Sequence, residues 1–324
     1  MKHLVVVNPK SFGKESDMFS VISNLKTYFE KNELNKDEYQ IYISRYPRDA
    51  IRVVNKYLSN TSEVVRVYSV GGDGILYDCL NGLIHFPNAQ LAIIPYGTTN
   101  DFVRAFGEGN QAIFRDIEKQ ANAPTIPTDV ICIGNRYVLN FCGIGIEAAT
   151  VLKYYEVSRK YPLLAKKLGK HLYMAVIPFA VIDILEKGVA SQKYEVIIDG
   201  EHYDGAYLGI NFANGSCYAG DKTPFPMAHP ADGLMEVMML SGKITPNTAI
   251  FVNRYTKGKY YKYPKILRHI RAKEIIVRSN APMHINADGE AYYGSEINAK
   301  IIPAAVNIVA PSGLSYVRRQ NNAE

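Results

Sequence analysis

The sequence predicts an N-terminal α/β domain built on an open parallel sheet, followed by a second, β-rich domain. The first observation is length, because 324 residues exceed the ~100–200 residues of a typical domain. The second is an alternation of apolar strands and helical patterns along about the first 120 residues, typical of a parallel sheet covered by helices. The third is a change after Ala121–Pro127, where the turns lie closer together. We therefore expect a two-domain protein with an interdomain cleft.

Four strand-and-helix units are expected in the first domain. Their strands are the apolar runs Leu4–Val7, Tyr39–Ile43, Val64–Val70 and Leu91–Ile94. The first helix is indicated by Met18, Ile22, Leu25 and Phe29 at helical spacing, with a cap near Ser16. The later helices are expected at residues 50–58, at residues 75–84 and from about Asn100 onward.

The second domain is expected to begin near residue 125. Tyr194–Ile198 and Tyr203–Ile210 alternate in polarity and flank an Asp199-Gly200 turn, which predicts a hairpin. A helical insert is expected at about residues 158–187, and its apolar part, Leu172–Leu185, is shorter than the ~20 residues of a membrane span. We place the domains at residues 1–124 and 125–307, with the tail 308–324 packing back onto the first.

Composition narrows the class of protein. The 47% hydrophobic and 21% charged fractions are those of an ordinary globular chain. The four cysteines and seven histidines lack the spacing of a zinc site or a disulfide framework. The N-terminal apolar run is too short for a signal peptide, so we expect a cytoplasmic protein.

One basic stretch indicates a partner. Val237–Lys273 contains nine Lys and Arg residues and no Asp or Glu, and tyrosines at 255, 260, 261 and 263 alternate with the cations. This composition suits an anionic membrane surface. Charge alone would suit nucleic acid equally well, and a solvated basic face is the plain alternative.

The strongest motif is Gly71-Gly72-Asp73-Gly74, between an expected strand and helix. Glycines let the backbone approach a bound group, and a helix N-terminus favours an anion, so this loop predicts a phosphate site. Asp73 would repel a bare phosphate, which suggests that Mg²⁺ or a ribose hydroxyl is also bound. A tight turn without function is the alternative.

Two further loops follow neighbouring strands. Gly97-Thr98-Thr99-Asn100-Asp101 offers hydroxyls and a possible helix cap, and Asn8–Lys14 offers a hydroxyl and two cations. Ligands of open α/β sheets bind at the carboxyl edge of the strands, so these loops predict one site. No Gly-Lys pair is followed by Ser or Thr, which excludes a Walker A loop.

Two acidic clusters lie later in the chain, at Asp232-Gly233 and at Asp288-Gly289-Glu290. Either could be a simple hairpin turn. A phosphoryl-transfer enzyme, however, needs metal ligands and a base, and carboxylates can serve as both. Gly143–Ala148 superficially matches a dinucleotide fingerprint, but no acidic residue follows about 20 positions later, and we discount it.

The ordered set of motifs resembles the diacylglycerol-kinase-type lipid kinase family, which is related to the sphingosine kinases. The set comprises NPKS, GGDGILYDCLNGL, PYGTTNDFVRAFG, CGIGIEA, IDGE, PMAHPADGLMEV and NADGE, and it covers nearly the whole chain. The resemblance implies a first domain like those of phosphofructokinase and NAD kinase and a C-terminal β-sandwich. It implies transfer of a phosphoryl group from ATP, with Mg²⁺, to a membrane lipid, most simply diacylglycerol. It also implies peripheral association with the inner face of the membrane.

The resemblance assigns roles to matching positions. Glu290 would be the general base with Asp288 beside it, and Asp73 would act at the phosphates. The nucleotide-binding positions would be Asn8, Pro9, Ser11, Ser44, Gly71, Gly72, Asp73, Gly74, Thr98, Asn100 and Asp101, the last in a water-mediated magnesium network. A structural Mg²⁺ would be held by Asp232 and the backbone oxygens of His229 and Leu234.

Several positions depart from the family pattern. Ile75 replaces a Thr, Tyr77-Asp78 replaces Asn-Glu, Phe12 lengthens the first loop, and Gly215–Gly220 lacks a triple glycine. The alternatives that stay open are an NAD kinase and a catalytically inactive lipid-binding or regulatory protein. The sequence does not identify the acceptor lipid or the oligomeric state, with a homodimer as one option. We expect no nucleic acid as a partner.

Overall fold

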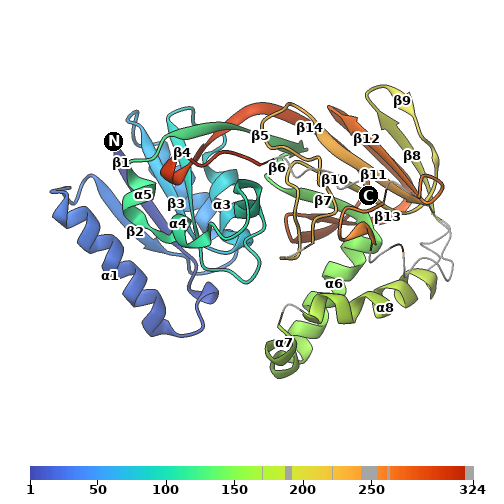
Figure 1. The fold of residues 1–324 in the computed structure, drawn as a ribbon, viewed down its shortest axis with the longest axis horizontal. Coiled ribbons are helices and arrows are strands. Elements are labelled where there is room, and N and C mark those ends of the chain that lie inside the picture. Colours follow the sequence, from blue (N-terminus) through green and yellow to red (C-terminus); the bar gives the residue numbers. More distant parts are fainter. Residues whose placement is uncertain are drawn as a thin grey trace. The chain divides into compact units, whose positions relative to one another are not determined.

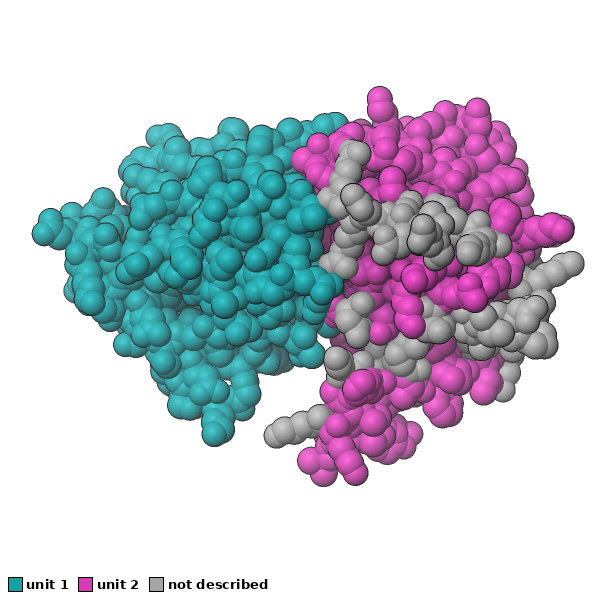
Figure 2. Space-filling model, viewed as in Figure 1, with its two compact units in different colours: residues 1–130, 303–317 teal, residues 131–302, 318–324 magenta. Residues whose placement is uncertain are grey.

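The chain folds into two compact units in this computed structural model, and Figure 2 colours them separately. The structure describes residues 1–169, 171–186, 192–220, 222–241, 251, 254–260 and 263–317. Unit 1 comprises Met1–Val130 and Pro303–Val317, and unit 2 comprises Ile131–Ile302. The division falls after Val130, inside strand β5 (Thr125–Ile133), a few residues after the predicted start of the second domain.

Unit 1 is a parallel sheet with helices connecting its strands (Figure 1). The strand order is β2-β1-β3-β4, and the last residues of β14 (Glu290–Val309) extend the sheet beside β4, where Asn307 pairs with Gln90. Its strands are β1 (Lys2–Val7), β2 (Tyr39–Ile43), β3 (Val65–Gly71) and β4 (Ala89–Pro95). Its helices are α1 (Glu15–Lys31), α2 (Asp49–Leu58), α3 (Asp73–Leu83), α4 (Gln111–Arg115) and α5 (Ile117–Ala121), with short 3-10 turns η1 (Pro9–Ser11), η2 (Phe102–Phe106) and η4 (Pro311–Gly313).

The core of unit 1 confirms the α/β prediction for this part of the chain. Met18, Ile22, Leu25 and Phe29 are all buried along one face of α1, where they meet Val5, Val7, Tyr68 and Val70 of the central strands. Every residue of β3 is buried, as expected of an inner strand of a parallel sheet. These strands end together, so the loops that follow them lie at one edge.

Unit 2 is mainly antiparallel. Its strand order is β12-β11-β10-β7-β13-β14, with β8 beside β13 and β10. Its strands are β6 (Arg136–Val138), β7 (Phe141–Gly145), β8 (Lys193–Ile198), β9 (Glu201–His202), β10 (Gly205–Ala213), β11 (Met235–Ser241), β12 (Leu267–Ala272) and β13 (Glu274–Ala287), together with the ends of β5 and β14. Its helices are α6 (Ile146–Lys160), α7 (Pro162–Leu168) and α8 (His171–Glu186).

Three local predictions need correction. The first helix begins at Glu15 after Lys14, so Ser16 lies inside it and is not the cap. No long helix begins near Asn100, because Asn100 has a φ of 50° and is followed only by the five-residue turn η2. The helical insert begins at residue 146 and consists of three helices.

The expected hairpin at Asp199-Gly200 is present, with φ angles of 48° and 87° at the two turn residues. Its second strand is interrupted, since β9 ends at His202 and β10 starts at Gly205. Among the helices that the described residues form, none is both long enough and apolar enough to span a bilayer.

The tyrosines of the basic stretch have a structural role. Tyr255 and Tyr260 are buried in a cluster with Phe225, Met238 and Phe251, while the side chains of Lys257 and Lys259 are exposed. The alternation of Tyr and Lys therefore reflects core and surface. Lys243, Lys262 and Tyr261 lie outside the described residues.

Candidate functional site

The GGDG loop closes the end of β3 and starts α3. Gly71 has a φ of 153°, and a Cβ atom there would come within 2.7 Å of the Ser11 hydroxyl, so only glycine fits beside the first loop. A Cβ on Gly74 would meet no atom within 4 Å. The loop is thus closed on one side and open above the first turn of α3, where backbone N–H groups lack helical partners. This arrangement can bind a phosphate.

The second loop lies directly against the first. A Cβ on Gly97 would fall 2.3 Å from the Cα of Gly72, and both Tyr96 and Gly97 donate backbone hydrogen bonds to the carbonyl of Gly71. Asn100 closes the loop from within, since its side chain accepts from the Gly97 N–H at 2.9 Å and donates to the Gly97 carbonyl at 2.7 Å. The two glycine loops form one surface.

Asp73 ties these loops together. Its carboxylate accepts the Thr99 hydroxyl at 2.5 Å and the Asp101 backbone N–H at 2.8 Å. Burial raises the pKa of the Asp73 carboxyl, while the Thr99 and Asp101 hydrogen bonds act in the opposite direction. Asp73 therefore has a positioning role in this geometry, and its role at a metal stays a prediction.

The other positions predicted in the first domain lie on the same unit. Asn8 caps η1 by accepting the Lys10 N–H at 3.1 Å, and its own N–H donates to Val70 at the end of β3. Ser44 follows β2 and donates its N–H to the Val7 carbonyl. Pro9 is half-buried in η1, and Thr98 is exposed in the second glycine loop. Ser11 contacts Gly71, so the NPKS loop and the GGDG loop meet, whereas nucleotide binding at these residues stays a prediction.

The departures from the family pattern in unit 1 have structural explanations. Ile75 packs its side chain against Gly71, and the extra residue Phe12 stacks near Tyr96 with ring centroids 5.0 Å apart. Asp78 accepts the Arg48 backbone N–H at 3.1 Å, and the Arg48 guanidinium lies over the Tyr77 ring. Ile75 and Phe12 therefore pack beside the loops, and Tyr77 and Asp78 connect α3 to Arg48.

The carboxylates of the NADGE segment belong to unit 2 and differ in role. Asp288 and Gly289 form a two-residue turn with φ angles of 47° and 89° between β13 and β14. The Asp288 carboxylate accepts three backbone N–H groups, from Leu139, Asn140 and Phe141. Asp288 therefore fixes the turn to the start of the β7 region. Glu290, which follows the turn, is half-buried, and its role as a base stays a prediction.

Helix α6 holds this turn from one face. The Tyr155 hydroxyl donates to the Gly289 carbonyl at 2.9 Å, and Asn286 donates to the Glu147 carboxylate at 3.1 Å. Residues 147 and 155 are eight positions apart and so lie on the same side of the helix. Sequence reasoning missed Tyr155 because a contact across 134 positions leaves no local pattern.

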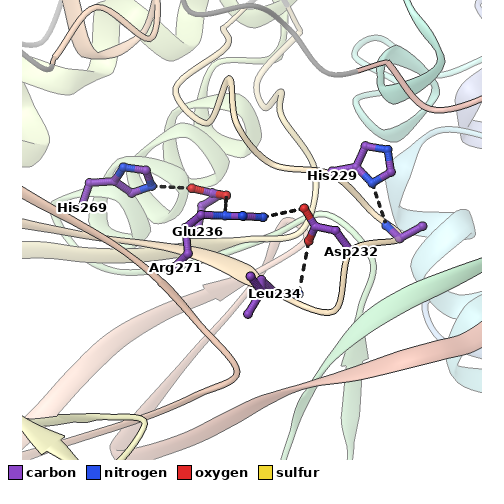
Figure 3. Close-up of polar contacts among 7 residues, drawn as sticks. His229, Asp232, Leu234, Glu236, His269 and Arg271 are labelled. Atoms are coloured by element: carbon purple, nitrogen blue, oxygen red, sulfur yellow. Dashed lines mark hydrogen bonds and ion pairs between the residues drawn. The ribbon is translucent and has the colours of Figure 1, made fainter.

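At the predicted structural magnesium site, the Asp232 carboxylate is paired with an arginine side chain. Arg271 donates to Asp232 at 2.5 Å and to Glu236 at 2.8 Å, while His269 also contacts Glu236 (Figure 3). Glu236 is 1% exposed and Asp232 12% exposed, so one guanidinium cation pairs with two largely buried carboxylates.

Two of the expected ligand groups, the His229 carbonyl and the Asp232 carboxylate, already accept hydrogen bonds. The His229 carbonyl accepts the Ala231 N–H at 2.8 Å, and the other Asp232 oxygen accepts the Leu234 N–H at 3.2 Å. A divalent cation at Asp232 would also lie against the positive charge of Arg271. The residues present do not fit a structural Mg²⁺ here. In the part of the chain that the structure describes, no cluster of three or more His, Cys, Asp or Glu side chains could hold a metal.

The chain matches two protein families, one for each unit. Residues 2–133 match the family described as the diacylglycerol kinase catalytic domain. Residues 175–310 match the family described as the YegS C-terminal NAD kinase beta sandwich-like domain. The second match agrees with the expected β-sandwich.

Relatives and solved structures cover most of the chain. Proteins named "Putative lipid kinase" from Staphylococcus aureus strains JH9 and Newman are 25% identical over 255 residues, which is 76% of this chain and 78% of theirs. The crystal structure of a diacylglycerol kinase from Bacillus anthracis strain Sterne matches with a TM-score of 0.67 at 19% identity, over 97% of this chain and 98% of that one. A second structure from this strain has a TM-score of 0.70 at 20% identity. These structures share the fold.

Proposed function

We propose, from the premise that this chain belongs to the diacylglycerol kinase catalytic domain family, that it transfers the γ-phosphoryl group of ATP to the hydroxyl group of a membrane lipid. The acceptor we propose is diacylglycerol, and the product is then phosphatidic acid. The observation that carries the proposal is the joined pair of glycine loops at the carboxyl edge of the unit 1 sheet. A kinase needs such a cradle for the phosphates of its nucleotide.

Unit 1 would bind the nucleotide. The open N–H groups at the start of α3 would contact the phosphates, and Asp73 would keep the second loop against the first while they bind. Mg²⁺ would enter as the magnesium complex of ATP, with Asp101 near it through water. Asn8, Ser11 and Ser44 would contact the rest of the nucleotide.

Unit 2 would supply the base. The Glu290 carboxylate would accept the proton of the lipid hydroxyl as its oxygen attacks the γ-phosphorus, and ADP would leave with the electrons of the broken P–O bond. Asp288, Tyr155 and Asn286 would hold the turn that precedes Glu290. Rigid support of this kind keeps a reacting group within the small range of positions that catalysis needs.

The test is an ATP-consumption assay against a panel of lipid alcohols, with products identified by mass spectrometry. Glu290→Gln should lower kcat by about 10²–10⁴-fold, the usual contribution of a general base. Glu296→Gln is the matched control, because Glu296 lies exposed on the same strand, where it pairs with Arg278. It should keep normal activity. If the Glu290→Gln enzyme is as active as the wild type, Glu290 is not the general base.

NAD is the second acceptor to include, because the unit 2 family carries an NAD kinase-like description. Phosphorylation of NAD with no turnover of any lipid would replace the lipid proposal. A wild-type protein that binds lipid but consumes no ATP with any acceptor would identify an inactive homologue.

A further inference from the structure

An exposed apolar group lies where α6 ends and α7 begins. Leu163 is 84% exposed, Tyr161 50% and Leu164 45%. Single exposed apolar residues are normal on a protein surface. Here three exposed apolar residues lie within four positions, and one of them is almost wholly exposed. Apolar patches of this kind mark interaction sites.

Helix α8, the next helix along the chain, also exposes apolar side chains. It buries Leu172, Val176 and Ala180 along one side, and Ala180 packs with Ala149 and Ile146 of α6. Its other side still exposes Phe179 at 58% and Ile182 at 49%. A helix that is apolar on more than one face normally has more than one packing partner. The described contacts with α6 cover only one of these faces.

The charge around the patch has one sign. Residues 159–170, with the sequence RKYPLLAKKLGK, contain five cations and no acidic residue. The side chains of Arg159, Lys160 and Lys167 are exposed. The nearby acidic residues Glu156 and Asp183 are already paired with Lys153, at 3.1 Å and 3.0 Å. An anionic partner is therefore favoured.

The position of α7 suits contact with an extended surface. Figure 1 shows α7 at the end of the three-helix segment, away from the strands of unit 2. Helix α6 packs against β7, β10 and β13, whereas α7 packs on α6 and α8. A large surface could reach Leu163 without disturbing the sheet.

We propose that residues 159–168, here called the basic corner, dock on an anionic lipid bilayer. Tyr161, Leu163 and Leu164 enter the interfacial region, and Arg159, Lys160 and Lys167 contact the head groups. Nucleic acid would leave the leucines in water. A second copy of this chain, placed symmetrically, would bring like charges together and be repelled. The inference uses the proposed function only in that a lipid kinase works at a membrane.

The experiment is vesicle sedimentation without ATP or acceptor lipid. The vesicles contain phosphatidylcholine with about 30% phosphatidylglycerol, a composition whose negative surface attracts basic segments. Leu163→Asp should weaken vesicle binding at least about tenfold. The change removes an apolar side chain that would enter the bilayer and adds a negative charge, which the anionic vesicle surface repels. Phe19→Asp is the matched control, since Phe19 is 53% exposed on α1, and it should bind as the wild type does.

The charges are tested in the same assay. The double variant Arg159→Gln with Lys160→Gln should weaken binding to the anionic vesicles more than tenfold, at about fivefold for each cation. Its binding to vesicles of pure phosphatidylcholine should differ little from that of the wild type. Lys26→Gln with Lys31→Gln, on the exposed side of α1, is the control.

Unchanged vesicle binding by Leu163→Asp would overturn the proposal. A wild-type dimer in light scattering that Leu163→Asp dissociates, with vesicle binding unaffected, would instead make the patch a protein interface. The catalytic proposal is judged separately, since Leu163→Asp should phosphorylate a short-chain, water-soluble acceptor at the wild-type rate. Loss of that activity with intact vesicle binding would place Leu163 in substrate handling and also overturn the docking proposal.

Discussion

Replacing Arg271 by Met should destabilise unit 2, because the guanidinium is the cation paired with two carboxylates that are largely buried. Glu236 is 1% exposed and Asp232 12% exposed, and Arg271 donates to both. Removing one partner of a buried ion pair costs about 3–5 kcal/mol. The Arg271 side chain is 35% exposed, so water screens part of the interaction, and we expect a loss of about 2–3 kcal/mol. For a unit of this size, that corresponds to a fall in Tm of about 4–10 °C.

Magnesium should then affect the variant but not the wild type. Without Arg271, Asp232 and Glu236 form an acidic pair that a divalent cation can neutralise. Mg²⁺ at about ten times its Kd would return roughly 1.4 kcal/mol to the Arg271→Met protein. The wild-type Tm should be the same in EDTA and in Mg²⁺, because Arg271 already holds the carboxylates.

Differential scanning calorimetry without nucleotide measures both effects. Arg268→Met is the control, because Arg268 lies exposed three residues earlier on the same strand and should cost less than about 1 kcal/mol. A wild-type protein that melts lower in EDTA and higher in Mg²⁺ would refute the reasoning and restore the magnesium site at Asp232. Equal melting of Arg271→Met and the wild type would show that the ion pairs contribute nothing.

Two further predictions concern the turn before Glu290 and the core of unit 1. Tyr155→Phe should lower kcat about 2–10-fold with little change in KM for ATP, because one hydrogen bond that holds the turn before Glu290 is lost. Tyr293→Phe is the control. A Tyr155→Phe enzyme with normal kcat would show that this hydrogen bond does not matter for turnover. Burial lowers the pKa of His3 to about 4, so the unfolded chain binds a proton that the folded chain does not as the pH falls from 6.5 to 4. Stability should therefore drop by up to about 3 kcal/mol over this range, and His3→Leu should flatten that part of the Tm–pH curve; equal slopes for the two proteins would exclude His3 as the cause.

The sequence predicted the central elements of unit 1 well, because short apolar runs in a parallel sheet have few alternatives. Tyr39–Ile43 was placed at the correct residues, and the helix face of Met18, Ile22, Leu25 and Phe29 is buried as expected. Asn100 misled the prediction because its side chain bonds within the loop and its backbone takes the left-handed conformation, which stops an α-helix.

Contacts between distant segments could not be read from the sequence. Nothing in Asp232-Gly233 reveals that Arg271, 39 positions later, occupies the place where a metal was expected. The basic stretch showed its charge correctly, but a linear pattern cannot tell that Tyr255 and Tyr260 point into a core. A local motif specifies chemical groups, whereas folding decides which groups meet.

The pairing of β14 with β4 also has a consequence for the order of folding during synthesis. The outer edge of β4 is bonded by Asn307 and Ile308, which leave the ribosome after almost all of the chain. Until then, the newly made N-terminal sheet has an open edge, and open strand edges recruit other chains. Unit 1 is therefore the first to be translated but cannot be completed until unit 2 has been made. A truncated protein ending at residue 130 should aggregate rather than behave as an independent nucleotide-binding domain.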